Sequence, residues 1–267
     1  MHLKRVGTGP VQNEGVWVGK LFKEDKKYDL YVIECFEDNY GFIIRGRDRP
    51  NELISFDAPD GVKVGNEANR MAIGGDSGGT LHVLVTHGHH DHVGGMGDLI
   101  ELWCNGGEGR KVKVYGPADA RCVDSVGDKH EYVTVKGGSV LSIAGNSVEV
   151  LDTTGHTCPH LSFHIPELKF CMTGDSLFSL GCGRVFEGTM NQMYEAMGKY
   201  EAIGGDTWIA CSHEYTLANA RYMRSLGGSE GLDERIREVE ELRERGAPSV
   251  PVTMEVSASR KTGERGE

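Results

Sequence analysis

The stretch Thr86–His92 constrains the fold of this 267-residue chain more than any other segment. It reads T-H-G-H-H-D-H, with His87, His89 and His92 as candidate imidazole ligands beside the Asp91 carboxylate. Residues 81–86 before it are apolar and β-branched and predict a buried strand, and residues 96–103 after it predict a helix. The candidate ligands therefore lie on a tight strand-to-helix turn, where their side chains can converge. Such a set suits a zinc-like divalent ion, and a histidine-rich surface turn is the alternative.

The composition restricts the class of protein. An apolar content of 38% is enough for a substantial core, and no apolar run approaches the roughly 18–20 residues of a membrane span. A net charge of −11 argues against binding to nucleic acid or to a membrane surface. The 7 cysteines include no C-x-x-C pair, which indicates reduced thiols. Because the first residues also lack the apolar segment of a secretory signal, we expect a cytoplasmic protein, and we expect it to be a monomer.

The hydrophobic pattern divides the chain into four parts. Residues 1–27 are polar and read as an N-terminal extension with one short strand near 16–18. Residues 28–188 hold closely spaced strands and predict an α/β part with an antiparallel or mixed sheet, in which 65–79 forms a weak helix at most. Residues 189–256 are mainly helical, and residues 257–267 form a polar tail.

Three more candidate metal ligands lie at the ends of predicted strands. His156 lies in a G-H-T turn, Asp175 follows Gly174, and His213 ends the predicted strand 207–213, which interrupts the helical part and returns to the sheet. Taken singly they could be a turn histidine, a turn former and a core histidine. Their order after the Thr86–His92 turn favours a buried two-metal site at one edge of a sheet. His160 and His164 follow the His156 turn, and we expect them at most to support the ligands.

The order of these motifs resembles the metallo-β-lactamase superfamily and, more narrowly, glyoxalase II, the hydroxyacylglutathione hydrolases. The matching stretches are residues 38–40, 86–95, 155–157, 173–178, 181–184, 186–189 and 213–216. The resemblance implies a metallo-β-lactamase-type αββα sandwich with a smaller C-terminal helical domain. Residues 28–188 would then be the catalytic domain, and residues 189–256 would be the substrate-binding region.

The resemblance also implies the ligand set. His87, His89 and His156 would hold one metal ion, Asp91, His92 and His213 the other, and Asp175 would bridge them. Both ions are expected to be Zn²⁺, although the same ligands accept iron or manganese. Asp91 and Asp175 are the carboxylates expected to serve catalysis, by holding the ions that activate a bridging hydroxide.

Three residues are expected to bind substrate. Arg184 occupies the place of the basic residue that contacts the glycine carboxylate of glutathione, and Tyr215 matches a tyrosine that contacts the tripeptide. Lys261 matches a basic residue of the closing C-terminal segment. Phe186 stands where some members carry a second tyrosine.

The expected function is hydrolysis of S-2-hydroxyacylglutathione thioesters, such as S-D-lactoylglutathione, to D-lactate and glutathione, a step of methylglyoxal detoxification. Two other enzyme functions remain open: a mononuclear iron persulfide dioxygenase, which shares the first motif and G-C-G-R, and a thioesterase for a glutathione-related thiol carrier. A non-catalytic metal-binding protein with the same fold is the alternative from a different class.

Overall fold

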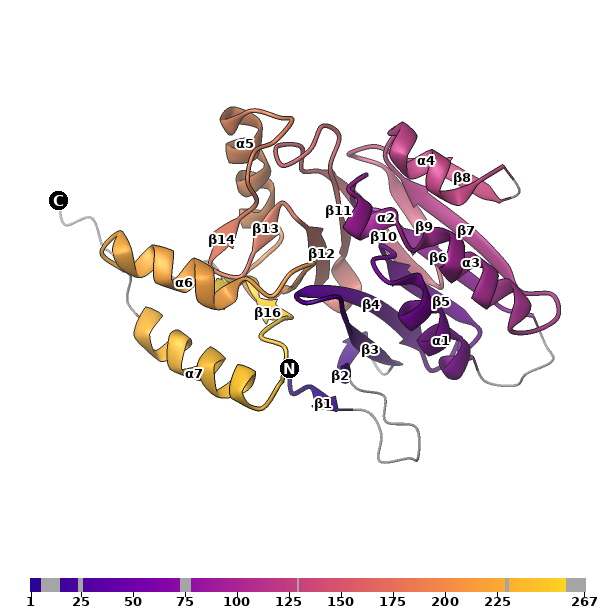
Figure 1. Ribbon diagram of the computed structural model, residues 1–267, viewed down its shortest axis with the longest axis horizontal. Helices are drawn as coiled ribbons and strands as arrows, with labels where there is room; N and C mark the ends of the chain where they lie inside the picture. The colour runs from indigo at the N-terminus through magenta and orange to yellow at the C-terminus, as the bar shows by residue number, and fades with distance from the viewer. Residues whose placement is uncertain (6–14, 24–25, 73–77, 129, 229–230, 258–267) are drawn as a thin grey trace.

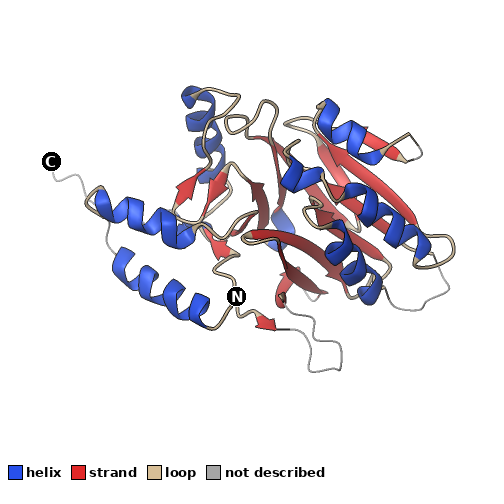
Figure 2. Ribbon diagram, in the orientation of Figure 1, coloured by secondary structure: helices blue, strands red, loops and turns tan. Residues whose placement is uncertain are grey.

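Two β-sheets pack face to face and helices cover their outer faces, as the ribbon views show (Figures 1 and 2). This computed structural model describes residues 1–5, 15–23, 26–72, 78–128, 130–228 and 231–257. The arrangement is the αββα sandwich that the family resemblance implies. The helices α6 (Thr216–Ser225) and α7 (Leu232–Glu244) lie beyond one end of the sandwich (Figure 1).

The first sheet contains eight strands in chain order. They are β1 (Lys4–Arg5), β2 (Val16–Lys23), β3 (Lys26–Cys35), β4 (Asn39–Gly46), β5 (Glu52–Phe56), β6 (Thr80–Leu84), β7 (Lys111–Gly116) and β8 (Glu131–Thr134). Neighbouring strands from β1 to β5 pair antiparallel, and those from β5 to β8 pair parallel, so the sheet is mixed. Part of the segment that the sequence assigns to an N-terminal extension thus forms the long strand β2.

The second sheet has the order β16-β15-β12-β11-β10-β9. Its strands are β9 (Val140–Ile143), β10 (Asn146–Asp152), β11 (Leu161–Ile165), β12 (Phe170–Gly174), β15 (Trp208–Cys211) and β16 (Val252–Thr253), and β13 (Leu177–Phe178) and β14 (Gly181–Cys182) form a separate ribbon. Only β12 and β15 pair parallel among these strands. Their carboxyl ends, which lead to Asp175 and His213, therefore lie at the same edge of the sheet.

The remaining helices are α1 (Gly61–Met71), α2 (His90–Val93), α3 (Met96–Asn105), α4 (Ala120–Val126), α5 (Met190–Glu201), α8 (Met254–Ser257) and the 3₁₀ turn η1 (Pro166–Leu168). Asp60 caps α1 by accepting a hydrogen bond from the Lys63 amide, so this helix begins before the weak helix expected within residues 65–79. A Cβ atom on Gly61 would lie 1.8 Å from the Gly95 carbonyl oxygen. Glycine at this position lets α1 pack directly against the turn that carries the histidines.

Two cores follow from the alternation of side chains along the strands. Along β3, Leu30 and Val32 face the second sheet, whereas Ile33 faces the helices on the outer side. Between the sheets, the ring centroids of Phe56 and Phe170 lie 5.5 Å apart. Burial of each such side chain contributes roughly 1.5–3 kcal/mol, so this shared core fixes the two sheets and the loops at their common edge. In the part of the chain that is described, no helix has the length and apolar character needed to cross a bilayer.

Candidate metal centre

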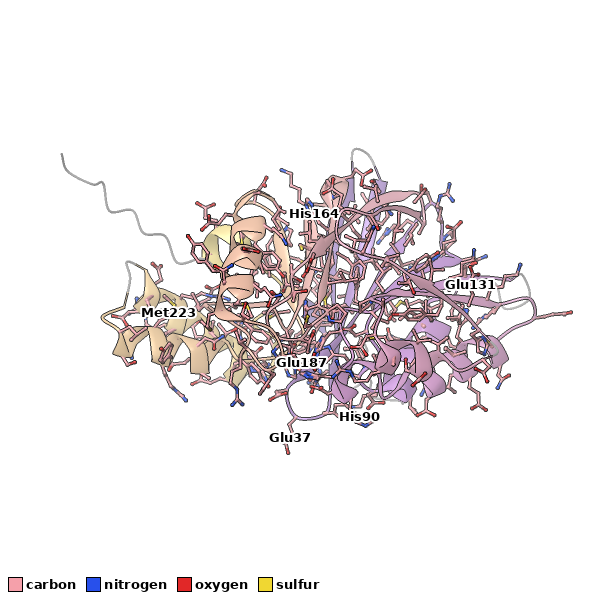
Figure 3. The ribbon with its side chains drawn as sticks, turned by 90° about the horizontal axis from the view of Figure 1, so that it is seen from above. Glu37, His90, Glu131, His164, Glu187 and Met223 are labelled. Atoms are coloured by element: carbon pink, nitrogen blue, oxygen red, sulfur yellow. The ribbon has the colours of Figure 1, made fainter. Side chains whose placement is uncertain are left out.

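The Thr86–His92 segment forms the strand-to-helix turn that its sequence predicts. The chain leaves β6 at Leu84 and enters α2 at His90. His87 and His92 are fully or almost fully buried, whereas His90 is exposed and points away from the cluster. Figure 3 shows His90 and Glu187 near one edge of the molecule and His164 at the opposite edge.

The three later candidates reach this turn from the second sheet. His156 follows β10, Asp175 follows β12 and His213 follows β15, and each side chain is buried. Gly174 just before Asp175 has a φ of +54°, a conformation that favours glycine. The structure therefore brings all seven candidate ligands together, four from the first sheet and three from the second.

The seven residues form overlapping groups whose potential ligand atoms lie within 4.8 Å of one another. The groups are His87/His89/His156, His87/His92/Asp175 and Asp91/His92/His213. Asp175 lies between the first and the last, since its Oδ2 is 3.5 Å from His156 Nε2 and 3.3 Å from His213 Nε2. Asp175 therefore lies between the two groups of residues that the family resemblance implies as separate ligand sets.

Unpaired polar atoms show that the residues fit metal ions. His87 Nε2, His92 Nε2 and Asp175 Oδ1 are buried and make no hydrogen bond among the described residues. A buried polar atom without a partner is unfavourable by about 1–3 kcal/mol, which a metal ion would offset. Imidazole nitrogen and carboxylate oxygen are ligands for zinc, iron and manganese alike, so the donor set does not select among them.

The outward nitrogen of each buried ligand histidine is held by a further group. His92 Nδ1 lies 2.8 Å from Asp57 Oδ2, His213 Nδ1 lies 2.9 Å from Asp38 Oδ1, and His156 Nδ1 donates to the Arg184 carbonyl at 2.8 Å. His87 Nδ1 lies 3.0 Å from the Thr86 hydroxyl. These contacts fix each ring and leave Nε2 free to face the cluster, which is the arrangement of metal-binding histidines.

Without metal ions, the charges of the cluster shift one another's pKa values. Burial opposes ionisation of Asp175, but His92 and His213 outweigh it and hold the pKa of the carboxyl well below its usual value. Burial lowers the pKa of His213, yet Asp175 and Asp91 raise it to about 10. Burial, reinforced by the neighbouring histidines His92 and His160, lowers the pKa of His87 well below its usual value. The carboxylates are therefore ionised at neutral pH, as metal ligands must be.

The expected substrate contacts border the cluster. The Arg184 guanidinium is exposed and lies 5.4 Å from the centroid of the Phe186 ring, which makes T-shaped contacts with the rings of His89 and His156. The Tyr215 ring stacks on His213, with centroids 4.7 Å apart and an interplanar angle of 8°. Lys261 lies outside the described residues. The free cysteines Cys158 and Cys182 are exposed.

Sequence reasoning missed the residues that support the ligands. Asp57 accepts hydrogen bonds from the amide and the hydroxyl of Thr86 as well as facing His92, and its φ is +53°. The sequence signal for this role is an aspartate at the end of a buried strand, directly before the A-P-D-G turn. Asp38 belongs to a stretch that matches the family, but no local pattern indicates its contact with His213.

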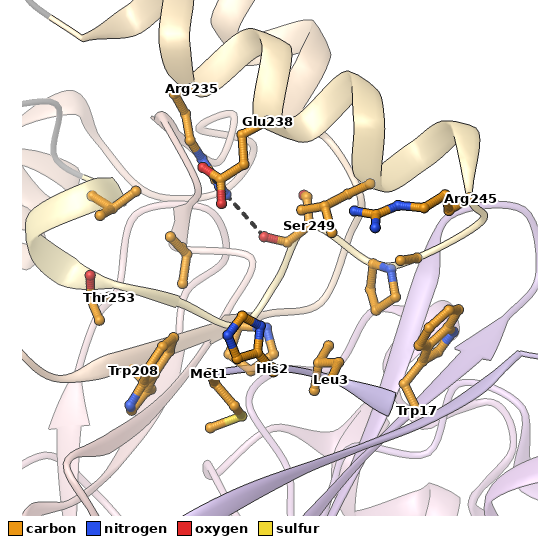
Figure 4. A pocket seen from close by; sticks show the side chains of 16 residues that line it. Met1, His2, Leu3, Trp17, Trp208, Arg235, Glu238, Arg245, Ser249 and Thr253 are labelled. Atoms are coloured by element: carbon orange, nitrogen blue, oxygen red, sulfur yellow. Dashed lines mark hydrogen bonds and ion pairs between the residues drawn. The ribbon is translucent and has the colours of Figure 1, made fainter. Parts of the chain in front are cut away.

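A separate cavity of about 510 Å³ lies between α7, residues 1–3 and the segment before β16, with Trp17 and Trp208 in its wall (Figure 4). Arg235 donates to the Ser249 carbonyl at 3.1 Å beside it. None of the seven candidate ligands is among the described residues that line this cavity.

Comparisons with known proteins identify the family. The sequence model of the Metallo-beta-lactamase superfamily matches residues 64–230. A hydroxyacylglutathione hydrolase of Erythrobacter litoralis is 32% identical over 85% of this chain and 83% of that protein. One of Ruegeria pomeroyi is 33% identical over 86% of this chain and 84% of that protein. The chain belongs to the glyoxalase II family of the metallo-beta-lactamase superfamily.

Among solved structures, ETHE1 from Myxococcus xanthus aligns over 91% of this chain and 95% of that protein, with a TM-score of 0.50 and 22% sequence identity. This likeness supports the metallo-β-lactamase fold alone. Membership of the glyoxalase II family, together with the histidine and aspartate groups, makes the chain a metallohydrolase.

Proposed function

We propose that this enzyme hydrolyses the thioester of an S-2-hydroxyacylglutathione, such as S-D-lactoylglutathione, to D-lactate and glutathione. The observation that carries the proposal is the position of Asp175 between two complete ligand groups. The names of the two bacterial relatives support the substrate class. In this role the enzyme would act in the cytoplasm, as a monomer, in the detoxification of methylglyoxal.

The seven ligands would hold two divalent ions, which we propose to be Zn²⁺. His87, His89 and His156 would bind one ion, Asp91, His92 and His213 the other, and Asp175 both. Two such ions, when bound, lower the pKa of a water molecule towards neutrality and polarise the thioester carbonyl. The protein's own part is to hold this geometry: Asp57 and Asp38 orient their histidines, and the carboxylates stay ionised.

Substrate recognition is assigned to residues at the border of the cluster. The exposed Arg184 guanidinium supplies a local positive charge on an acidic protein, for the glycine carboxylate of glutathione. Tyr215, held against His213, presents its hydroxyl to the tripeptide. Lys261 is proposed as a further contact to the thiol carrier, on the family resemblance alone. The thiolate is a good leaving group, so no side chain is required as a general acid.

Metal content and turnover test the proposal together. Purified protein should hold close to two divalent ions per chain and should consume the thioester absorbance of lactoylglutathione. His213→Ala should lose one ion preferentially, because His213 belongs to only one ligand group. His164→Ala is the matched control, since His164 is buried at the opposite edge and faces Glu149. Saturation of the wild-type protein by a single iron would contradict the proposal and favour the persulfide dioxygenase.

A further inference from the structure

A buried series of hydrogen bonds runs from α5 to the backbone of Asp175. The Tyr200 hydroxyl lies 2.6 Å from Ser162 Oγ, which lies 3.0 Å from Thr153 Oγ1. Thr153 Oγ1 lies 2.8 Å from His160 Nδ1, and the Asp175 amide donates to His160 Nε2 at 3.3 Å. Tyr200, Ser162, Thr153 and His160 each expose 0% of their surface. None of these four residues has a part in the mechanism above.

The backbone amide at one end of this series fixes the position of the hydrogen on His160. A backbone amide only donates, so His160 Nε2 must carry the lone pair and the proton of the neutral ring must be on Nδ1. That proton is donated to Thr153 Oγ1, whose own hydroxyl hydrogen is then free for Ser162 Oγ. The series thereby selects the tautomer that can accept from Asp175.

At the Tyr200 end of the series, every hydroxyl group can also find a donor or acceptor. Ser162 donates to the Thr173 carbonyl at 3.4 Å, which leaves its oxygen to accept from both Thr153 and Tyr200. Every hydroxyl then donates once, and the network is satisfied in the buried interior.

The position of the Gly174–Asp175 peptide explains why this acceptor matters. Strand β12 ends at Gly174, so the Asp175 amide lies beyond the ladder of that strand. A Cβ atom on Gly174 would lie 2.9 Å from Thr86 Cβ and 3.0 Å from His160 Nε2. The peptide is thus enclosed between the first turn of the metal centre and the His160 ring.

We propose that His160 is a positioning residue, which fixes the backbone of Asp175 and thereby the carboxylate shared by the two ligand groups. Thr153 sets the tautomer of His160, and Tyr200 extends the same network to α5. The inference rests on the proposed ligand role of Asp175. It assigns to His160 an effect on metal affinity and on kcat, with little effect on substrate binding, because His160 is buried beneath the cluster.

A matched pair of substitutions isolates the contact to Asp175. His160→Gln can place its amide oxygen where Nε2 stands, whereas His160→Asn places its amide near Nδ1 and leaves the Asp175 amide without an acceptor. His160→Asn should lower zinc affinity, measured by chelator competition, and kcat by about 10–100-fold, the usual effect of losing a group that orients a ligand. KM should stay within about twofold, and His160→Gln should recover most of the loss. Equal zinc affinity and kcat in the two variants would overturn the proposal.

A second measurement is made first on the wild-type protein, so its main result does not depend on the folding of a variant. In the zinc-loaded enzyme, ¹⁵N-resolved NMR of the imidazoles should show His160 protonated at Nδ1, and Thr153→Val should weaken that preference. A proton on Nε2 would overturn the proposal, because that nitrogen could not then accept from Asp175. If the wild-type protein does not bind two ions, the proposed function fails; if it does, and His160→Asn does too with unchanged affinity, only this inference fails.

Discussion

At the scale of single residues, some groups around the candidate metal centre orient its histidines, and others point to the solvent. The candidate ligand histidines His92, His213 and His156 turn Nε2 inward because Asp57, Asp38 and the Arg184 carbonyl, respectively, hold their outer nitrogens. The Arg184 residue thus serves twice: its backbone orients His156, while its guanidinium points to solvent over Phe186. A side-chain substitution at this position separates the two roles, since it leaves the carbonyl in place.

Arg184→Ala should therefore raise KM for lactoylglutathione and change kcat little. Loss of a charged hydrogen bond of about 1.5–3 kcal/mol corresponds to a KM increase of roughly tenfold to a hundredfold. Steady-state kinetics at low salt measures the effect, and Arg184→Lys, which keeps the charge, should recover part of it. An unchanged KM in the alanine variant would mean that Arg184 does not contact the substrate.

At the scale of elements, Glu214 connects the C-terminal helices to the metal centre. Its carboxylate accepts from the Tyr40 hydroxyl at 2.7 Å on β4 and from the Ser249 amide at 2.8 Å, and it lies 3.6 Å from Arg243 of α7. The next residue back along the chain is the candidate ligand His213. The segment after α7 is therefore tied to the strand end that carries this ligand.

Glu214→Gln should destabilise the protein, because it removes the charge shared by these donors. We expect the free energy of unfolding in urea to fall by about 1.5–3 kcal/mol, the contribution of hydrogen bonds to a charged group. Glu240→Gln, at an exposed position of α7, is the matched control and should change it by less than about 0.5 kcal/mol. Equal effects of the two substitutions would refute a connecting role for Glu214.

The elements that could be predicted from sequence are those with local signals. The Thr86–His92 turn follows from a β-branched strand and closely spaced candidate ligands, and many of the strands follow from alternation and turn residues, whereas the two-sheet sandwich was expected only from the family resemblance. Strand β2 was underestimated because its length depends on pairing with β3, residue by residue from Val16↔Ile33 to Lys23↔Lys26. The role of Asp57 depends on a positive φ and on a contact with His92, which is 35 residues away in sequence. Neither is visible in a local pattern.

At the scale of the whole molecule, one arginine links the two halves of the sandwich. Arg121 on α4 lies beside the first sheet and pairs with Asp119 at 2.7 Å and with Glu187 at 2.9 Å. Glu187 in turn accepts from the Cys158 amide at 3.0 Å, close to His156. Asp119 is buried, and its hydrogen bonds from Arg121 hold the pKa of its carboxyl below the usual value.

The stability of the protein should therefore depend on the charge of Asp119 in acid. In the unfolded chain this carboxyl takes up a proton at its usual pKa, whereas in the folded protein it does so at lower pH. Its contribution is thus complete above the usual pKa and is lost as the pH falls through the lowered pKa of the folded state. Asp119→Asn keeps the N-terminal cap of α4 but removes the charge.

We expect Asp119→Asn to be less stable than wild type by about 1–2 kcal/mol near neutral pH, and this difference to shrink as the pH falls below the usual pKa of the carboxyl and through its lowered pKa in the folded state. Urea unfolding of the metal-free proteins at several pH values measures it, so that protonation of metal-bound ligands does not contribute. Asp124→Asn, exposed on the same helix, should show no such trend. A difference that stays constant with pH would show that the charge of Asp119 is not responsible.

Each proposed ion takes ligands from both sheets, and this makes it a cross-link. The ion between His89 and His156 joins residues 67 positions apart, and the other joins Asp91 to His213 over a still longer stretch. Closing a loop of that length removes freedom mainly from the unfolded chain, as a disulfide does. All seven cysteines of this chain are unpaired. If the two proposed ions bind, they would thus join the two sheets without oxidation of a thiol, and the ion held by Asp91 and His213 could bind only after synthesis has passed His213.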